Sequence, residues 1–280
     1  VITLVVIIDY KMGNSGSILN MIGNMRKDAI ISSEKETIKS ADYLILPGVG
    51  AFDHGIRNID ILGLREVLIE KVIHKNTPIL GICLGMQLLT KSSEEGSLSG
   101  LSFINAETVK FDFMNDEINQ NLKIPHMGWN KLNVKKNCPI LKDMDGEYFY
   151  FVHSYYANPD DEEVISGVTD YGVDLVASLS NNNCFATQFH PEKSGISGLK
   201  ILKKFVGILM KTNKKQTALK INNDLLIEEY FEDVLLIGIS STSEYYTLLS
   251  YISQQLGFHF KRNHELEIQN TGILNFQFMI

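Results

Sequence analysis

Three short apolar segments in the first third of the chain limit the folds open to it. They cover residues 3–9, 42–48 and 78–85, are partly β-branched and are bounded by turn residues, as buried parallel strands are. Stretches with helical periodicity lie between them at residues 17–26 and 64–74. Strands that alternate with helices form right-handed crossovers and a sheet covered on both faces. The sequence therefore predicts an α/β protein with a parallel core.

Beyond residue 100 the expected strands follow one another closely, separated by turns rich in Asn, Asp and Gly. They cover residues 103–111, 129–134, 147–152, 163–168, 174–180 and 184–189. This spacing predicts an antiparallel, meander-like part packed onto the parallel core. A helix at 198–209 is expected to complete a domain of residues 1–211.

Residues 212–280 form a predicted C-terminal extension of the α+β type. Its expected elements are a strand at 234–240, a helix at 244–257 and a strand at 258–262. An extension of this size supports only a marginal core of its own. We assign it no function.

Composition and charge narrow the functional classes. The 280 residues are 44% hydrophobic and 21% charged, and the net charge of -7 comes without a concentrated basic face, which argues against nucleic-acid binding. No apolar run approaches the roughly 18 residues of a membrane helix. The three cysteines are widely separated and lack metal-ligand spacing, so we expect no metal site and no cofactor, in a reducing, cytoplasmic setting.

A cysteine stands between two glycines where the third apolar segment turns into a helix-forming sequence. The stretch Gly-Ile-Cys-Leu-Gly, residues 81–85, has the mechanics of a nucleophile elbow, in which small residues permit a sharp, strained turn. Cys83 would then lie at the carboxyl end of a parallel strand and at a helix N-terminus, which favours the thiolate. The amides of Leu84 and Gly85 are placed to stabilise an oxyanion.

A free cysteine is more often a small buried hydrophobe, and that is the interpretation for Cys138 and Cys184. Cys83 differs because a candidate base exists for it. In the stretch 186–195 a predicted strand is followed by His190, then by a proline that constrains the turn, and then by Glu192.

A cysteine nucleophile needs a proton acceptor, and the acceptor needs a carboxylate that orients it. Cys83, His190 and Glu192 supply these residue types. A second glycine-rich loop at 46–52 ends another strand but lacks both the full GxGxxG pattern and the lysine of a P-loop. Its backbone, Gly50 in particular, is expected to approach the substrate instead.

These motifs together resemble a known family. "GICLGMQLL", "PGVGAF" and "FHPEKSG" are similar to the triad-type, class I glutamine amidotransferases. More narrowly, "IIDYKMGN", "IPHMGWNKL" and "YFVHSYY" resemble the glutaminase subunits of imidazole glycerol phosphate synthases, in the family's order over roughly residues 2 to 210. The resemblance implies a flavodoxin-like mixed sheet with flanking helices.

The resemblance also implies roles for single residues. Cys83 would be the nucleophile, His190 the general acid/base and Glu192 its orienting carboxylate. Positions that match the glutamine pocket and oxyanion loop are Gly50, Gly85 and Gln87. Positions that match the face toward a partner are Asn14, Trp129, Tyr155 and Lys193. That partner would be a (β/α)8-barrel cyclase subunit, in a heterodimer that passes ammonia from glutamine to imidazole glycerol phosphate formation in histidine biosynthesis.

Three other interpretations stay open. A glutaminase of this type could serve a different acceptor, in anthranilate, nucleotide or carbamoyl-phosphate synthesis, although the motifs at 124–132 and 150–156 argue against it. A cysteine hydrolase of similar fold would act on γ-glutamyl substrates without a partner. A binding subunit without catalysis is disfavoured because all three triad types are present.

One departure from the family concerns residues 25–38, whose shortness predicts a clipped second strand.

Overall fold

The computed structural model describes residues 3–23, 25, 28–111, 122–208, 259–262 and 276–279. The chain divides into two compact units, Val1–Ala218 and Leu219–Ile280. The first unit contains every residue singled out above as functional.

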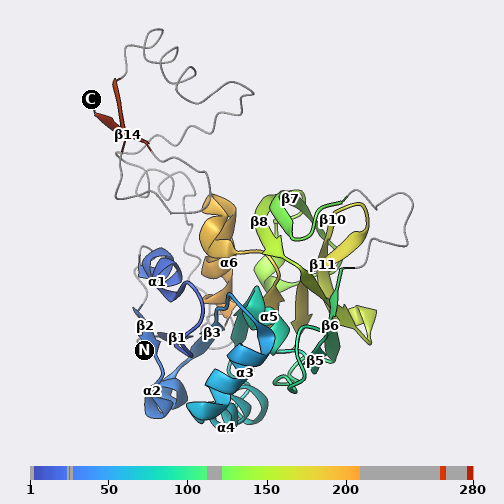
Figure 1. Cartoon of the computed structure of the whole chain (residues 1–280). Helices are drawn as coiled ribbons and strands as arrows, with labels where there is room; N and C mark the ends of the chain where they lie inside the picture. The colour runs from blue at the N-terminus through green and yellow to red at the C-terminus, as the bar shows by residue number, and fades with distance from the viewer. Residues whose placement is uncertain are drawn as a thin grey trace. The chain divides into compact units, whose positions relative to one another are not determined.

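The described part of the first unit is built around a nine-stranded mixed sheet (Figure 1). Across the sheet the strands are β2 (Asp28–Ser32), β1 (Leu4–Ile8), β3 (Tyr43–Leu46), β4 (Ile79–Ile82), β12 (Cys184–Thr187), β11 (Asp174–Asn181), β10 (Ile165–Asp170), β7 (His126–Val134) and β8 (Tyr148–His153). Neighbours from β2 to β12 pair in parallel, and those from β12 to β8 pair antiparallel. This confirms the predicted α/β class with a parallel core and an antiparallel part.

Helices cover both faces of the parallel half (Figure 1). On one face lie α1 (Ser15–Gly23) and α6 (Gly195–Phe205). On the other lie α2 (Lys35–Ser40), α3 (Phe52–Ile61), α4 (Arg65–Ile69) and α5 (Leu84–Leu88). Apolar side chains from both strand and helix are fully buried between these layers, which explains why β3 and β4 are apolar at every position.

Two details of the predicted meander are wrong. The segment expected at 184–189 is β12, which pairs in parallel with β4 from Cys184↔Ile79 to Thr187↔Ile82 and so belongs to the parallel core. The segment expected at 103–111 contributes β6 (Ala106–Lys110) to a separate sheet with β5 (Ser92–Ser93) and β9 (Tyr155–Pro159). Strand direction and sheet membership depend on tertiary pairing, which a short apolar run does not encode.

The second strand is not clipped. β2 pairs with β1 along its whole length, from Leu4↔Asp28 to Ile8↔Ser32. The short segment before β3 is therefore long enough to complete the edge of the sheet.

The helix predicted at 64–74 is α-helical through Ile69 and continues as a π-helix over Glu70–His74.

In the second unit β13 (His259–Arg262) pairs antiparallel with β14 (Phe276–Met279). This confirms the strand expected at 258–262. The strand expected at 234–240 and the helix at 244–257 lie outside the described residues. None of the helices in the described ranges has the length and apolar character needed to cross a membrane.

Candidate active site

Cys83 lies in a strained turn between β4 and α5. Its backbone has φ 52° and ψ -109°, a positive-φ conformation that a residue with a Cβ seldom adopts. The turn is held by the Cys83 N–H, which donates to the Thr187 carbonyl of β12 at 2.8 Å. A Cβ on Gly85 would overlap the Leu46 carbonyl oxygen, so this position accepts only glycine. The elbow predicted from the two glycines is therefore present.

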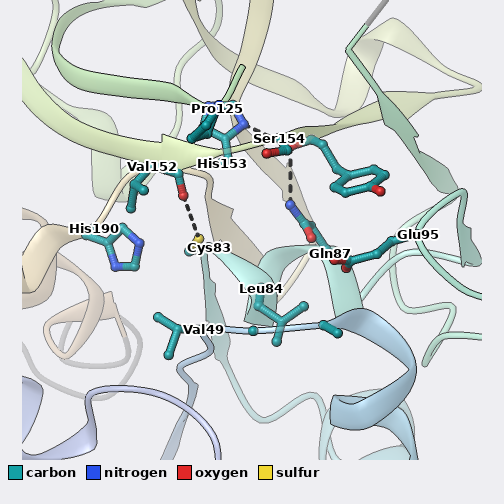
Figure 2. A pocket seen from close by; sticks show the side chains of 13 residues that line it. Val49, Cys83, Leu84, Gln87, Glu95, Pro125, Val152, His153, Ser154 and His190 are labelled. Carbon is teal, nitrogen blue, oxygen red and sulfur yellow. Dashed lines mark hydrogen bonds between the residues drawn. The ribbon is translucent and has the colours of Figure 1, made fainter. Parts of the chain in front are cut away.

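His190 reaches the same place from the neighbouring strand. Because β4 and β12 are parallel and in register, Cys83 and the residues after Thr187 leave the sheet at the same edge. The His190 N–H donates to the Tyr150 carbonyl at 2.9 Å, which ties the turn to β8. In Figure 2 the His190 ring lies beside Cys83 at the wall of a cavity.

Glu192 sits behind the histidine, in the short 3-10 helix η4 (Pro191–Lys193). Its Oε1 lies 2.7 Å from His190 Nδ1, and the two side chains are 2% and 1% exposed. A carboxylate in this place makes Nδ1 the protonated nitrogen and leaves Nε2 as the reactive one. Within the described residues Nε2 has no hydrogen-bond partner.

The surroundings of His190 favour its protonated form. Burial opposes a charge on the ring, but the interactions with Cys83 and Glu192 outweigh it and raise the pKa of His190 to about 9. The buried Cys184 is a contrast, because burial alone raises the pKa of its thiol to about 12. The structure thus places Cys83 next to a hydrogen-bonded imidazole–carboxylate pair at the wall of a cavity.

The cavity has a volume of about 590 Å³, which suits a small molecule such as an amino acid. Its walls come from the loop 49–51, the elbow with Cys83 and Gln87, and the segment 152–155. Gly50, the residue singled out in the glycine-rich loop, has φ 109° and is part of this lining.

The glycine loop packs directly on the elbow. The Leu84 N–H, expected to be free for an oxyanion, donates to the Gly48 carbonyl at 3.3 Å. A Cβ on Gly48 would lie 2.8 Å from the amide nitrogen of Gly85, so the two backbones touch without room for a side chain. Of the two amides that the sequence suggests as oxyanion donors, the one of Leu84 is thus occupied by the loop carbonyl.

Glu95 is a pocket residue that sequence reasoning missed. It is the acidic side chain among those that line the cavity, and Figure 2 shows it across the pocket from His190, beyond Gln87. Its Oε2 accepts the Phe52 N–H at 2.8 Å, which anchors the carboxylate at the start of α3. In the sequence Glu94 and Glu95 look like an ordinary charged turn, and nothing local separates them.

Further polar groups surround the cysteine. Gln87, 5% exposed, donates from Nε2 to the Tyr155 carbonyl and to Gln188 Oε1, both at 3.3 Å. Gln188 in turn donates from Nε2 to Cys83 Sγ at 3.7 Å. Gln188, like Glu95, was not predicted. Among the described residues no group of three or more His, Cys, Asp and Glu could hold a metal ion.

The residues matched to a partner face are arranged in different ways. Trp129 on β7 is 55% exposed, and Lys193 places Nζ 5.7 Å from the centre of the Tyr150 ring. Tyr155 lines the cavity. Asn14 is exposed immediately before α1, a helix that packs against η4 with its Lys193.

Comparisons with known proteins agree with this arrangement. Residues 6–208 match the family described as glutamine amidotransferase class-I. The chain is 49% identical to imidazole glycerol phosphate synthase subunit HisH 2 of Methanococcus maripaludis over 207 residues, 72% of this chain and 98% of the relative. It is 43% identical to the HisH subunit of Natronomonas pharaonis over 210 residues, 72% of this chain and 93% of the relative.

Solved structures resemble it in fold. A putative GMP synthase subunit from Thermoplasma acidophilum superposes with a TM-score of 0.56 at 20% identity, over 76% of this chain and 96% of that one. PurLQS from Thermotoga maritima gives 0.56 at 18% identity, over 75% of this chain and all of the other. At these identities the likeness concerns the fold alone.

Proposed function

Since this chain belongs to the class I glutamine amidotransferases and, within them, to the HisH subunits of imidazole glycerol phosphate synthase, we propose that Cys83, His190 and Glu192 hydrolyse the side-chain amide of glutamine. The observation that carries this assignment is the buried His190–Glu192 pair at 2.7 Å, beside a cysteine in a strained turn. A purely structural cysteine requires neither the turn nor the pair.

The reaction follows from the geometry. Cys83 gives its thiol proton to His190 Nε2, in agreement with the raised pKa of His190, and the thiolate Sγ attacks the amide carbon so that a C–S bond forms. His190 then gives that proton to the leaving nitrogen as the C–N bond breaks, which releases ammonia and leaves a γ-glutamyl thioester. Water adds to the thioester with His190 as base, and glutamate leaves as the thiol is restored. Glu192 stays ionised and stabilises the imidazolium in each step.

The negative charge on the amide oxygen needs backbone donors. The Leu84 and Gly85 amides are adjacent to the nucleophile, but the Gly48 carbonyl accepts from the first of them. We infer that this arrangement is a resting state. A rotation of the loop around Gly48 and Gly50 that withdraws the carbonyl would free the donor, and a ligand that favours the rotated loop would activate the enzyme.

Glu95 supports glutamine, rather than a simple amide, as substrate. A carboxylate fixed at the far end of the cavity from His190 is suited to the α-ammonium group of an amino acid. The substrate would then span the cavity with its side-chain amide at Cys83. Gln87 lies between these two ends (Figure 2).

A partner is implied by the chemistry of the product. Ammonia released into neutral water becomes ammonium, which is not nucleophilic, so a docked acceptor enzyme is needed to use it. Met127 and Trp129 on β7 are 61% and 55% exposed, and Tyr148 on β8 is 57% exposed. Large apolar side chains exposed on adjacent strands favour this as the docking face for a (β/α)8-barrel cyclase in a heterodimer.

The cytoplasm, which keeps thiols reduced, fits the three free cysteines of the described chain.

The test is glutamate release from glutamine, with and without the cyclase partner plus its phosphoribosyl substrate. The proposal expects strong stimulation by the partner and its loss in Cys83→Ala. Equal activity with and without the cyclase would favour a free-standing γ-glutamyl hydrolase or a different acceptor. Full activity of Cys83→Ala would show that the catalytic assignment is wrong.

A further inference from the structure

Two buried histidines outside the triad form a hydrogen-bonded pair. His126 on β7 is fully buried and His153 at the end of β8 is 6% exposed. His126 Nδ1 lies 2.9 Å from His153 Nε2, and His126 Nε2 lies 3.0 Å from Asn130 Oδ1. His153 Nδ1 lies 2.8 Å from the Tyr155 carbonyl oxygen. Every ring nitrogen of the pair therefore faces a polar atom.

The pair has fewer protons than acceptors. Burial lowers the pKa of His126 and lowers that of His153 to about 3, so both rings are neutral and carry one N–H each. The Tyr155 carbonyl only accepts, which makes Nδ1 of His153 the protonated nitrogen and Nε2 an acceptor. Two N–H groups then have to serve three contacts, and one contact must lack its proton.

Asn130 decides which contact that is. Its Nδ2 donates to the Asp170 carbonyl at 2.9 Å, which leaves Oδ1 facing His126 and requires a proton on His126 Nε2. In this setting the lone pairs of His126 Nδ1 and His153 Nε2 face each other. A half-turn of the amide lets Nδ2 donate to His126 Nε2, moves the proton to Nδ1 and completes the bond to His153, while Oδ1 then faces the Asp170 carbonyl. In either orientation of the Asn130 amide, one pair of hydrogen-bond acceptors is in contact. A small change around Asn130 therefore selects between the two orientations.

The pair is connected to the nucleophile. The Tyr155 carbonyl accepts from His153 and also from Gln87 Nε2 at 3.3 Å. Gln87 contacts Gln188 at 3.3 Å, and Gln188 donates to Cys83 Sγ at 3.7 Å. An unbroken series of polar contacts thus runs from β7 to the sulfur.

We propose that Asn130, His126 and His153, here called the histidine relay, transmit the state of the exposed strand β7 to Cys83. This inference rests on the proposed function. Asn130 follows Trp129, one of the exposed residues of the proposed docking face, so a partner that shifts this strand changes the environment of the Asn130 amide. The relay residues are positioning residues: His126 and Asn130 act on the reaction through Tyr155, Gln87 and Gln188.

Two substitutions of His126 separate a relay from a packing role. The ring stacks on Phe151 at 4.9 Å and on Tyr171 at 4.1 Å between centroids. His126→Phe keeps an aromatic ring but removes both polar contacts. His126→Asn gives up the stacking and supplies an amide N–H near the position of Nδ1, so it can still donate to His153. Lys135→Ala, an exposed change just after the end of the same strand, is the control.

The measurements are stimulation of glutamate release by the cyclase subunit with its phosphoribosyl substrate, the Kd for that subunit, and the rate at which iodoacetamide alkylates Cys83, followed on its own peptide. We expect His126→Phe to lose at least tenfold in stimulation and severalfold in alkylation rate with an unchanged Kd. His126→Asn should recover most of both. Wild-type behaviour of the Phe variant would overturn the relay, as would equal losses in the Phe and Asn variants, because stacking would then be the ring's role.

A second variant keeps the test decisive if His126→Phe does not fold. Asn130→Ala removes the input of the relay at a half-buried position, and the relay expects the same loss of stimulation with an unchanged melting temperature. Retained stimulation there would contradict it. If the wild-type protein is not stimulated at all, the proposed function fails, and the alkylation rates of the three variants still decide on the relay.

Discussion

Nδ1 of His190 lies 2.7 Å from Oε1 of Glu192, and both side chains are almost completely withdrawn from water. A carboxylate in that place selects the tautomer in which Nε2 can take a proton. The cysteine, histidine and glutamate follow the ends of two adjacent parallel strands, β4 and β12, so the sheet sets where each segment starts.

Glu192→Gln tests this relationship with little change in volume. The glutamine amide can donate to Nδ1, which moves the ring proton to Nε2 and removes the base that faces Cys83. We expect kcat for glutamine hydrolysis to fall about 10²–10⁴-fold with KM little changed. Steady-state kinetics with the cyclase present measure it. A kcat within a factor of three of the wild type would mean that Glu192 does not orient the histidine.

The raised pKa of His190 predicts a pH dependence of stability. The folded-state pKa of about 9 lies above the ordinary value of 6.5, so the folded state holds the proton more tightly than the unfolded chain. The resulting stabilisation is complete below pH 6.5 and is lost as the pH rises through 9, by an amount on the order of 3 kcal/mol. Urea unfolding between pH 6 and 9.5 measures it. In His190→Gln the decline over this interval should be smaller, and an equal decline would contradict the assignment to His190.

Gly85 of the elbow and Gly16 of α1 differ in the space that a side chain would find. Gly85→Ala would drive a methyl group into the Leu46 carbonyl, and we expect it to lower the free energy of unfolding by about 3 kcal/mol or more. Gly16→Ala in α1 meets nothing within 4 Å and should raise it by about 0.5–1 kcal/mol. Urea unfolding compares the pair. Equal stability of the two variants would mean that the elbow tolerates a side chain.

How much the sequence predicts depends on whether a feature is local. Cys83 lies in its own turn motif, and His190 and Glu192 are two residues apart, so the local sequence around each of them is sufficient to propose all three. Glu95 and Gln188 come into place only through the packing of the small sheet and the register of β12, and no local pattern distinguishes them from surface or core residues. The same reason explains why the direction of β12 was missed, whereas the alternation of strands and helices was not.

Glu95 provides a prediction on substrate binding. Glu95→Gln keeps an oxygen that can accept the Phe52 N–H but removes the charge proposed to bind the α-ammonium group. A lost charge-assisted hydrogen bond raises KM for glutamine about 10- to 100-fold with kcat nearly unchanged. Glu94→Gln is the matched control, since Glu94 lies outside the cavity lining and bonds the Lys110 N–H. If both variants have the wild-type KM, the α-ammonium group is bound elsewhere.

Trp129 provides the prediction on the partner. Its side chain is more than half exposed and meets the Tyr150 ring at 6.1 Å between centroids, so truncation removes a large apolar surface without opening the core. Trp129→Ala should weaken cyclase binding by about 2 kcal/mol or more, a Kd increase of roughly 30-fold, at an unchanged melting temperature. Ile61→Ala is the control: it removes apolar surface at an 82% exposed position in α3, outside β7 and β8, and should leave the Kd for the cyclase unchanged. Titration calorimetry compares the two. If Trp129→Ala binds as tightly as the wild type, the cyclase docks on another face, and the exposed side chains of β7 and β8 no longer support the proposed heterodimer.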